Sequence, residues 1–143
     1  MHDSYEAVTS GETVALGSHE MTRSEIVSFA EQYDPQQFHV NDDPEGPFGG
    51  LIASGWHTAA VTMRLAVDGY LGEAATVGSP GLDGLRWHEP VRPGDRLTAT
   101  LTLGEREPFD ESRGLVHQEI ETRNQHGETV LWMDALTLYR RRS

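Results

Sequence analysis

The sequence predicts an α+β fold in which an antiparallel sheet of about five strands wraps around one long central helix. Three observations carry this prediction. Residues 51–71 contain no proline and are apolar on almost every side, which is typical of a helix surrounded by protein. From residue 75 onward, apolar and polar residues alternate with the period of half-buried strands. The loops between those strands are short, so the strands must be antiparallel, because parallel crossovers need longer connections.

A chain of 143 residues with 36% hydrophobic and 24% charged residues predicts one globular domain over residues 1–143. It has no cysteine, which excludes disulfides, thiolate zinc sites, iron–sulfur clusters and cysteine nucleophiles. No window approaches the ~20 consecutive apolar residues that a membrane helix needs. Residues 1–10 also lack the basic-then-apolar pattern of a signal peptide. We therefore expect a cytoplasmic protein without a membrane partner.

The charge of the chain argues against nucleic acid as a partner. It carries 23 acidic and 11 basic residues, a net charge of −12, and every basic residue is arginine. Such a field repels phosphate backbones. Two origins of the acidity stay open: a surface that keeps its carboxylates hydrated at high salt, or an acidic protein whose base composition favours arginine over lysine.

The first third of the chain predicts a short strand and then a helix. The strand covers Thr13–Gly17. The helix starts at Thr22, because Thr22 and Glu25 match a capping box. Pro35 restricts the residue before it to extended conformations, so the helix ends there and Asp34 lies at its exit. Apolar residues fall at three- and four-residue steps along this helix: Ile26, Phe29, Ala30 and Tyr33.

A loop, the central helix and the remaining strands follow. Residues 41–50 (NDDPEGPFGG) are turn-forming and predict a loop. In the helix of residues 51–71, Ser54 is the expected N-cap and Gly69 lies near the expected C-terminus. Four further strands are predicted, the last two joined by a hairpin turn at 124–127: residues 84–88, 97–103, 115–123 and 129–139.

Residues 33–39 (YDPQQFH) place a carboxylate and an imidazole, Asp34 and His39, on one constrained loop. An aspartate and a histidine this close can share a water molecule and pass protons in both directions. The helix that begins near Gly55 can hold a developing oxyanion on its first N–H groups, at its positive dipole end. Glycine at that position removes the Cβ that would block a ligand. This spacing has two interpretations: acid–base chemistry beside a backbone oxyanion site, or a structural role in which Asp34 is a turn or cap residue.

These motifs resemble those of the MaoC-like dehydratases, including the (R)-specific enoyl-CoA hydratases, of the hot-dog fold superfamily. The resemblance lies in the Asp34–His39 stretch, in the Ser54-Gly55 turn into the helix and in residues 84–95 (GLRWHEPVRPGD). It extends from about Gly11 to Tyr139. It implies a hot-dog fold, in agreement with the elements predicted above, and a hydro-lyase that needs no cofactor.

The resemblance implies reversible hydration of a trans-2-enoyl-CoA to an (R)-3-hydroxyacyl-CoA. Asp34 and His39 would activate the water, and the N–H of Gly55 would take the charge on the thioester oxygen. Which of the two side chains is the base stays open, because coupled groups titrate as a pair. The chain departs from the family pattern at two positions. Gln37 replaces the usual proline, which we expect to loosen the loop around His39, and Asn41 stands where aspartate is frequent.

A CoA substrate brings anionic phosphates to an acidic protein, so local arginines must bind them. Arg64, Arg86 and Arg92 flank the predicted site and are the candidates, with Ser54 as a further substrate contact. The seven histidines show no ligand-like spacing of three or four residues, so no metal is expected. His57 is expected to pack or to hydrogen-bond rather than to act as a second base.

A sheet of about five strands with one helix leaves an edge or a face exposed, so we predict a homodimer. Two other functions stay open. One is an acyl-CoA thioesterase, which would release free thiol from saturated acyl-CoA. The other is a non-catalytic acyl-CoA-binding protein or a partner subunit of a heteromeric dehydratase, although the presence of both Asp34 and His39 argues against it.

Overall fold

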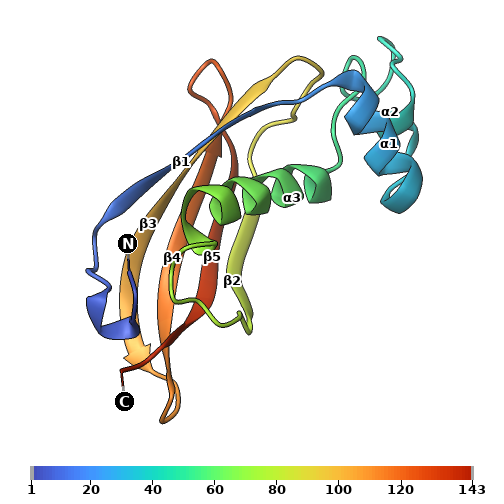
Figure 1. Cartoon of the computed structure of the whole chain (residues 1–143). Coiled ribbons are helices and arrows are strands. Elements are labelled where there is room, and N and C mark those ends of the chain that lie inside the picture. Colours follow the sequence, from blue (N-terminus) through green and yellow to red (C-terminus); the bar gives the residue numbers. More distant parts are fainter. Residues whose placement is uncertain (1, 143) are drawn as a thin grey trace.

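The predicted strands form one antiparallel sheet in the computed structural model, which describes residues 2–142 (Figure 1). They are β1 (Thr13–Glu20), β2 (Gly81–Trp87), β3 (Arg96–Pro108), β4 (Arg113–Arg123) and β5 (Thr129–Arg140). Their spatial order is β1-β3-β4-β5-β2, and every neighbouring pair is antiparallel. The sheet curves around the helix α3 (Gly55–Ala66), as Figure 1 shows. The predicted α+β architecture is confirmed.

The alternating strand β3 supplies much of the core. Its leucines and alanine at odd-numbered positions are completely buried, while Thr98 and Thr100 between them are exposed. The odd-numbered residues pack with apolar side chains of β4, β5 and α3. This core contains Leu97, Ala99, Leu101, Leu103, Val116, Ile120, Leu131, Met133, Val61 and Leu65. Removal of this apolar surface from water, at about 25 cal/mol per Å², is the main force that holds the helix against the sheet.

Strand β1 is longer than expected, because Gly17 forms a β-bulge instead of ending the strand. The pairing register with β3 shifts between Ala15 and Gly17. Gly17 has a φ of 103°, a conformation that favours glycine. Leu16 has no partner in this register, and pairing resumes at Gly17, opposite Ala99, and continues to Glu20.

Helix α1 (Arg23–Tyr33) begins and ends where the sequence predicted. The capping box is formed in both directions: the N–H of Thr22 donates to Glu25 Oε1 at 2.8 Å, and the N–H of Glu25 donates to Thr22 Oγ1 at 3.2 Å. Asp34 follows as the C-cap, and its N–H donates to the carbonyl of Ala30 at 2.8 Å. The backbone of Asp34 is therefore fixed by the helix end.

The central helix is shorter than the predicted range 51–71. The N–H groups of Ile52 and Ala53 donate to the carbonyls of Phe38 and Val91, outside the helix, so this stretch is not helical and the helix starts after Ser54. Beyond α3 the chain makes one π-helical turn, η2 (Val67–Leu71), which contains Gly69. A survey of residues 2–142 finds no helix with the length and apolar character that crossing a bilayer requires.

One face of α3 and η2 stays uncovered by the chain. Trp56, Met63 and Val67 on this face are 59, 49 and 41% exposed. Beside them lies a groove of about 330 Å³ between the helix and the edge strand β2, where Leu82 is 46% exposed. The expectation of a helix surrounded by protein is therefore wrong for a single chain, whose sheet covers only the opposite face.

Candidate active site

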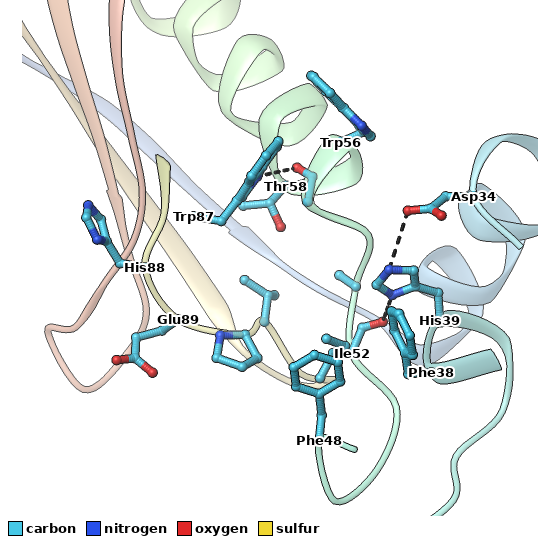
Figure 2. Close-up of a pocket in the computed structure, with 14 residues that line it drawn as sticks. Asp34, Phe38, His39, Phe48, Ile52, Trp56, Thr58, Trp87, His88 and Glu89 are labelled. Atoms are coloured by element: carbon cyan, nitrogen blue, oxygen red, sulfur yellow. Dashed lines mark hydrogen bonds and ion pairs between the residues drawn. The ribbon is translucent and has the colours of Figure 1, made fainter. Parts of the chain in front are cut away.

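The predicted carboxylate and imidazole meet in the structure. Asp34 lies at the end of α1, and His39 lies on the short helix α2 (Gln37–Val40) rather than on the expected loop. The Nε2 atom of His39 is 3.4 Å from Oδ2 of Asp34, with side chains 6 and 18% exposed (Figure 2). This distance is longer than a strong hydrogen bond, and one shared water molecule can connect the two groups.

The backbone fixes the tautomer of His39. Its Nδ1 atom lies 2.8 Å from the carbonyl oxygen of Ile52 (Figure 2). A carbonyl only accepts, so Nδ1 carries the hydrogen, and the neutral ring keeps its lone pair on Nε2. That lone pair faces Asp34, which makes the neutral imidazole a proton acceptor at this position.

Asp34 is held in its ionised form. The side-chain amide of Gln36 donates to Oδ1 and the hydroxyl of Ser54 donates to Oδ2, each at 2.7 Å. The Gln36 bond is the main cause that holds the pKa of Asp34 below its usual range. Ser54 and the nearby His39 act in the same direction, while burial opposes them. Asp34 is therefore a carboxylate that faces the imidazole of His39.

The N-terminal end of α3 faces the Asp34–His39 pair. Ser54 caps the helix, since its Oγ accepts from the N–H of Trp56 at 3.3 Å. Gly55 is the first helical residue, so helix geometry gives its N–H no intrahelical acceptor. This N–H lies at the positive end of the helix dipole and can bind a developing oxyanion.

Gly55 is required for a reason different from the one we expected. A Cβ at this position would lie only 2.5 Å from Cε2 of Trp87, and the indole Nε1 of Trp87 donates to the carbonyl of Gly55 at 2.8 Å. The space beside Gly55 is therefore filled by the indole ring of β2 rather than left open for a ligand.

Replacing Ser54 by alanine is expected to have two effects. Loss of the helix cap lowers the free energy of unfolding by about 1 kcal/mol. Loss of the donor raises the pKa of Asp34 toward its ordinary value. A lowered carboxyl pKa stabilises the fold above the pKa of the unfolded chain, and this contribution is lost as the pH falls through the lowered value. Urea unfolding on the acid side should therefore show a smaller pH dependence for the variant than for the wild type.

Ser24→Ala is the matched control, because Ser24 is exposed and lies in α1 away from Asp34. Its stability should stay within about 0.5 kcal/mol of the wild type at each pH. A Ser54→Ala variant with an unchanged pH dependence would show that the hydroxyl does not influence the Asp34 carboxylate.

A cavity of about 460 Å³ opens beside the pair (Figure 2). The cavity is lined mainly by apolar and aromatic side chains, which exclude water and strengthen electrostatic interactions with a bound group. Trp87 and Thr58 also line the cavity, although the sequence motifs did not indicate them as wall residues. Thr58 follows Ser54 by four residues and so shares its helix face, a spacing that could have revealed it. The apolar and aromatic wall is made of Phe38, Phe48, Ile52, Ala53, Trp56, Trp87, Pro90 and Val91.

Gln37 and Asn41, the two departures from the family pattern, hydrogen-bond to each other. The side-chain amide of Asn41 donates to the side-chain oxygen of Gln37. The backbone N–H of Asn41 also donates to the carbonyl of Gln37, at 2.8 Å. Both bonds close the single turn of α2 that carries His39, so the loosening expected around His39 is not found.

Of the three predicted phosphate-binding arginines, only Arg92 lies beside the cavity. Its guanidinium donates to the carbonyl of Phe48, a wall residue, at 2.6 Å. Arg64 instead pairs with Asp68, at 2.8 Å, on the exposed side of α3. Arg86 is exposed and donates to the carbonyl of its neighbour in β2.

His57 packs behind the site instead of joining the pair. Its ring stacks on Phe29 with centroids 4.8 Å apart, and its Nε2 lies 3.5 Å from a carboxylate oxygen of Glu25. Burial lowers the pKa of His57, while Glu25 opposes this effect. The buried ring fits the packing role that the sequence suggested.

Within residues 2–142, one set of side chains has ligand atoms close enough to hold a metal ion. Asp83, His117 and Asp134 come from three neighbouring strands, and their ligand atoms lie within 4.8 Å of one another. None of them lines the cavity. Sequence spacing could not show this set, because the sheet register brings it together.

The arrangement combines the groups that water addition needs. A carboxylate and a neutral imidazole can hold and deprotonate one water molecule. An unpaired N–H at a helix start can bind an oxygen that gains negative charge, and apolar walls can hold an acyl chain.

Comparison with known proteins points to one family. The chain matches the family model of the MaoC like domain over residues 7–125. The crystal structure of a MaoC-like dehydratase from Rhodospirillum rubrum is 36% identical, has a TM-score of 0.90 and is matched over 98% of each chain. Together with the sheet and helix described above, this match confirms the expected hot-dog fold.

Two sequence relatives cover different shares of the chain. The uncharacterized protein YdeM of Bacillus subtilis is 28% identical over 120 residues, which are 82% of this chain and 84% of that protein. The 3-hydroxyacyl-thioester dehydratase Z of Mycobacterium tuberculosis is 37% identical over 89 residues, 58% of each chain.

Proposed function

Because this chain belongs to the MaoC like domain family, we propose that it catalyses the reversible hydration of a trans-2-enoyl-CoA to an (R)-3-hydroxyacyl-CoA. The dehydratase names of the R. rubrum structure and the M. tuberculosis relative support a hydro-lyase at the family level. The observation that carries the proposal is the ionised Asp34 that faces Nε2 of His39 beside the cavity. The (R) configuration comes from the resemblance to the (R)-specific hydratases.

In this proposal His39 is the base. Its Nε2 accepts a proton from the bound water while the water oxygen attacks C3 of the enoyl group. The π electrons of the C2–C3 bond shift toward the thioester, and the negative charge on its oxygen is stabilised by the N–H of Gly55. The carboxylate of Asp34 stabilises the imidazolium that forms. The Asp34–His39 pair then returns a proton to C2, so one water molecule is added in total.

The free thioester must approach an acidic protein. Its CoA phosphates are repelled by the net charge of −12, and Arg92 beside Phe48 is the local cation that we propose for them. Salt screens the long-range repulsion more strongly than a close contact. The proposal therefore expects KM for the thioester to fall, or to stay constant, when the salt concentration rises.

The direct test is the loss of enoyl-thioester absorbance with trans-2-enoyl-CoAs of graded length, at low and high salt. Hydration of at least one of them to the (R)-3-hydroxyacyl product supports the proposal. Free thiol released from saturated acyl-CoA would instead identify a thioesterase. Tight acyl-CoA binding without turnover of any thioester would identify a non-catalytic binding protein.

We also propose that two copies of the chain associate through the uncovered face of α3 and the edge strand β2. This face carries Trp56, Met63 and Val67, and the edge carries Leu82 and Trp87, all of them exposed. A single chain leaves this apolar surface and the unpaired edge in water, which dimerisation relieves. The proposed dimer would bury both features at once.

The variant Met63→Glu is expected to shift this dimer to monomers, because it places a charge in the apolar contact. Light scattering after size-exclusion chromatography measures the change in mass. Phe109→Glu is the control: Phe109 is equally exposed, at 49%, but lies in the β3–β4 connection away from that face. If the wild-type chain is monomeric alone and dimeric only with a second MaoC-like chain, the assembly is heteromeric and the homodimer proposal fails.

A further inference from the structure

Thr58 carries a buried hydroxyl that the proposed mechanism leaves unused. The residue lines the cavity and is 1% exposed. Its Oγ1 atom has no hydrogen-bond partner among residues 2–142. Figure 2 shows the side chain at the first turn of α3, with the hydroxyl directed into the cavity. Buried hydroxyls without a partner are unfavourable, so this one calls for a partner that the free protein does not supply.

Thr62, one turn further along the helix, provides an internal comparison. It is 0% exposed, and its Oγ1 lies 2.7 Å from Oγ1 of Thr122 on β4. One buried threonine of α3 therefore binds the sheet, whereas the other remains unpaired where the helix borders the cavity. A threonine in a helix can also bond a carbonyl of the preceding turn, yet the Thr58 hydroxyl does not do so here.

Helix geometry directs this hydroxyl toward the oxyanion end of α3. Helical side chains tilt toward the N-terminus of their helix and cover the preceding turn. Thr58 follows Gly55 by three residues, and its N–H donates to the carbonyl of Ser54 at 3.2 Å. The side chain of Thr58 therefore covers the turn that presents the N–H of Gly55.

We propose that the Thr58 hydroxyl is a second donor to the thioester oxygen, beside the N–H of Gly55, and thus a catalytic residue. This inference rests on the proposed hydration. Every thioester substrate brings a carbonyl oxygen, which supplies the partner that the hydroxyl lacks in the free protein. When water adds to C3, negative charge collects on that oxygen until C2 is protonated, so this hydrogen bond is strongest in the transition state.

The first experiment uses the free protein. Thr58→Val replaces an unpaired hydroxyl by a methyl group of the same shape, so Tm is expected to stay constant or to rise by about 3 °C. Thr62→Val is the matched control and leaves Thr122 without its partner, so Tm should fall by roughly 3 °C or more. A clear fall in Tm for Thr58→Val would show that the hydroxyl is already bonded in the free protein and would overturn the proposal.

The second experiment measures hydration of crotonyl-CoA. Thr58→Val is expected to lower kcat about 10²-fold with little change in KM, because the lost bond forms mainly in the transition state. Thr58→Ser keeps the hydroxyl and should retain most of the activity, and Thr62→Val should keep kcat within about threefold. An unchanged kcat in Thr58→Val would contradict a catalytic role.

The third experiment separates this inference from the proposed function. Calorimetry compares butyryl-CoA with butyl-CoA, a thioether that lacks the carbonyl oxygen. Thr58→Val should weaken binding of the thioester about fivefold and leave thioether binding unchanged. If the wild type hydrates no enoyl-CoA but shows this difference, the hydration proposal fails and the contact with the thioester oxygen stands. If Thr58→Val weakens binding of both ligands equally, the proposed contact between the Thr58 hydroxyl and the thioester oxygen is ruled out.

Discussion

Replacing His39 by alanine is expected to lower kcat for enoyl-CoA hydration by roughly 10³-fold, with the fold retained. The physical reason is that Nδ1 is committed to the carbonyl of Ile52, so Nε2 is the one lone pair of this ring available to accept the proton of water. Stopped-flow absorbance on crotonyl-CoA measures the loss. Circular dichroism and light scattering establish that secondary structure and mass are unchanged.

Asp34→Asn tests the second member of the same pair. It removes the charge that stabilises the imidazolium, so we expect a loss of roughly 10²-fold or more. His88→Ala is the control, because His88 lines the same cavity but is exposed and points away from the pair in Figure 2. Full activity in both His39→Ala and Asp34→Asn would dismiss this site assignment.

The parts of the fold that depend on local pattern could be predicted from the sequence. The capping box at Thr22 and Glu25 and the proline after Asp34 define α1, because both act on neighbouring backbone groups. The alternation in β3 defines its buried face, because side chains of a strand point to opposite sides. These signals lie within a few residues of the element that they determine.

Features that depend on distant contacts could not be predicted in the same way. The start of α3 is set by carbonyls outside the helix that accept from Ile52 and Ala53, and no helix propensity encodes them. The bulge at Gly17 depends on the register with β3. Gly17 therefore looked like a strand end, although the pairing continues beyond it.

The candidate site also combines features that local sequence determines with features that distant contacts determine. The resemblance to a known family indicated Asp34, His39 and Gly55, which lie on short motifs. The orientation of His39 by a backbone carbonyl and the contact of Trp87 with Gly55 come from segments that are distant in sequence. Arg64 and Arg86 lie near the site motifs in sequence, but their side chains bind other partners.

Gly55→Ala is expected to lower kcat about 10²-fold, because the new methyl group collides with the indole of Trp87 and displaces the first turn of α3. The hydrogen bond from Trp87 Nε1 to the Gly55 carbonyl is broken in the same step, so Tm should fall as well. Steady-state hydration kinetics and thermal unfolding measure both effects. Gly69→Ala is the matched control: its Cβ would lie 2.9 Å from the backbone of Leu16, beyond the far end of α3. It should cost stability without a comparable loss of kcat.

A double-mutant cycle with Trp87→Leu identifies the cause of the loss. If the indole is the obstacle, adding Gly55→Ala to Trp87→Leu should change kcat by less than about threefold, since the collision has been removed in advance. If glycine is instead required so that the substrate itself can approach the helix start, the alanine should be equally damaging in both backgrounds. The cycle therefore decides between a glycine that accommodates Trp87 and a glycine that accommodates the thioester, and the distance of 2.5 Å to the indole favours the first.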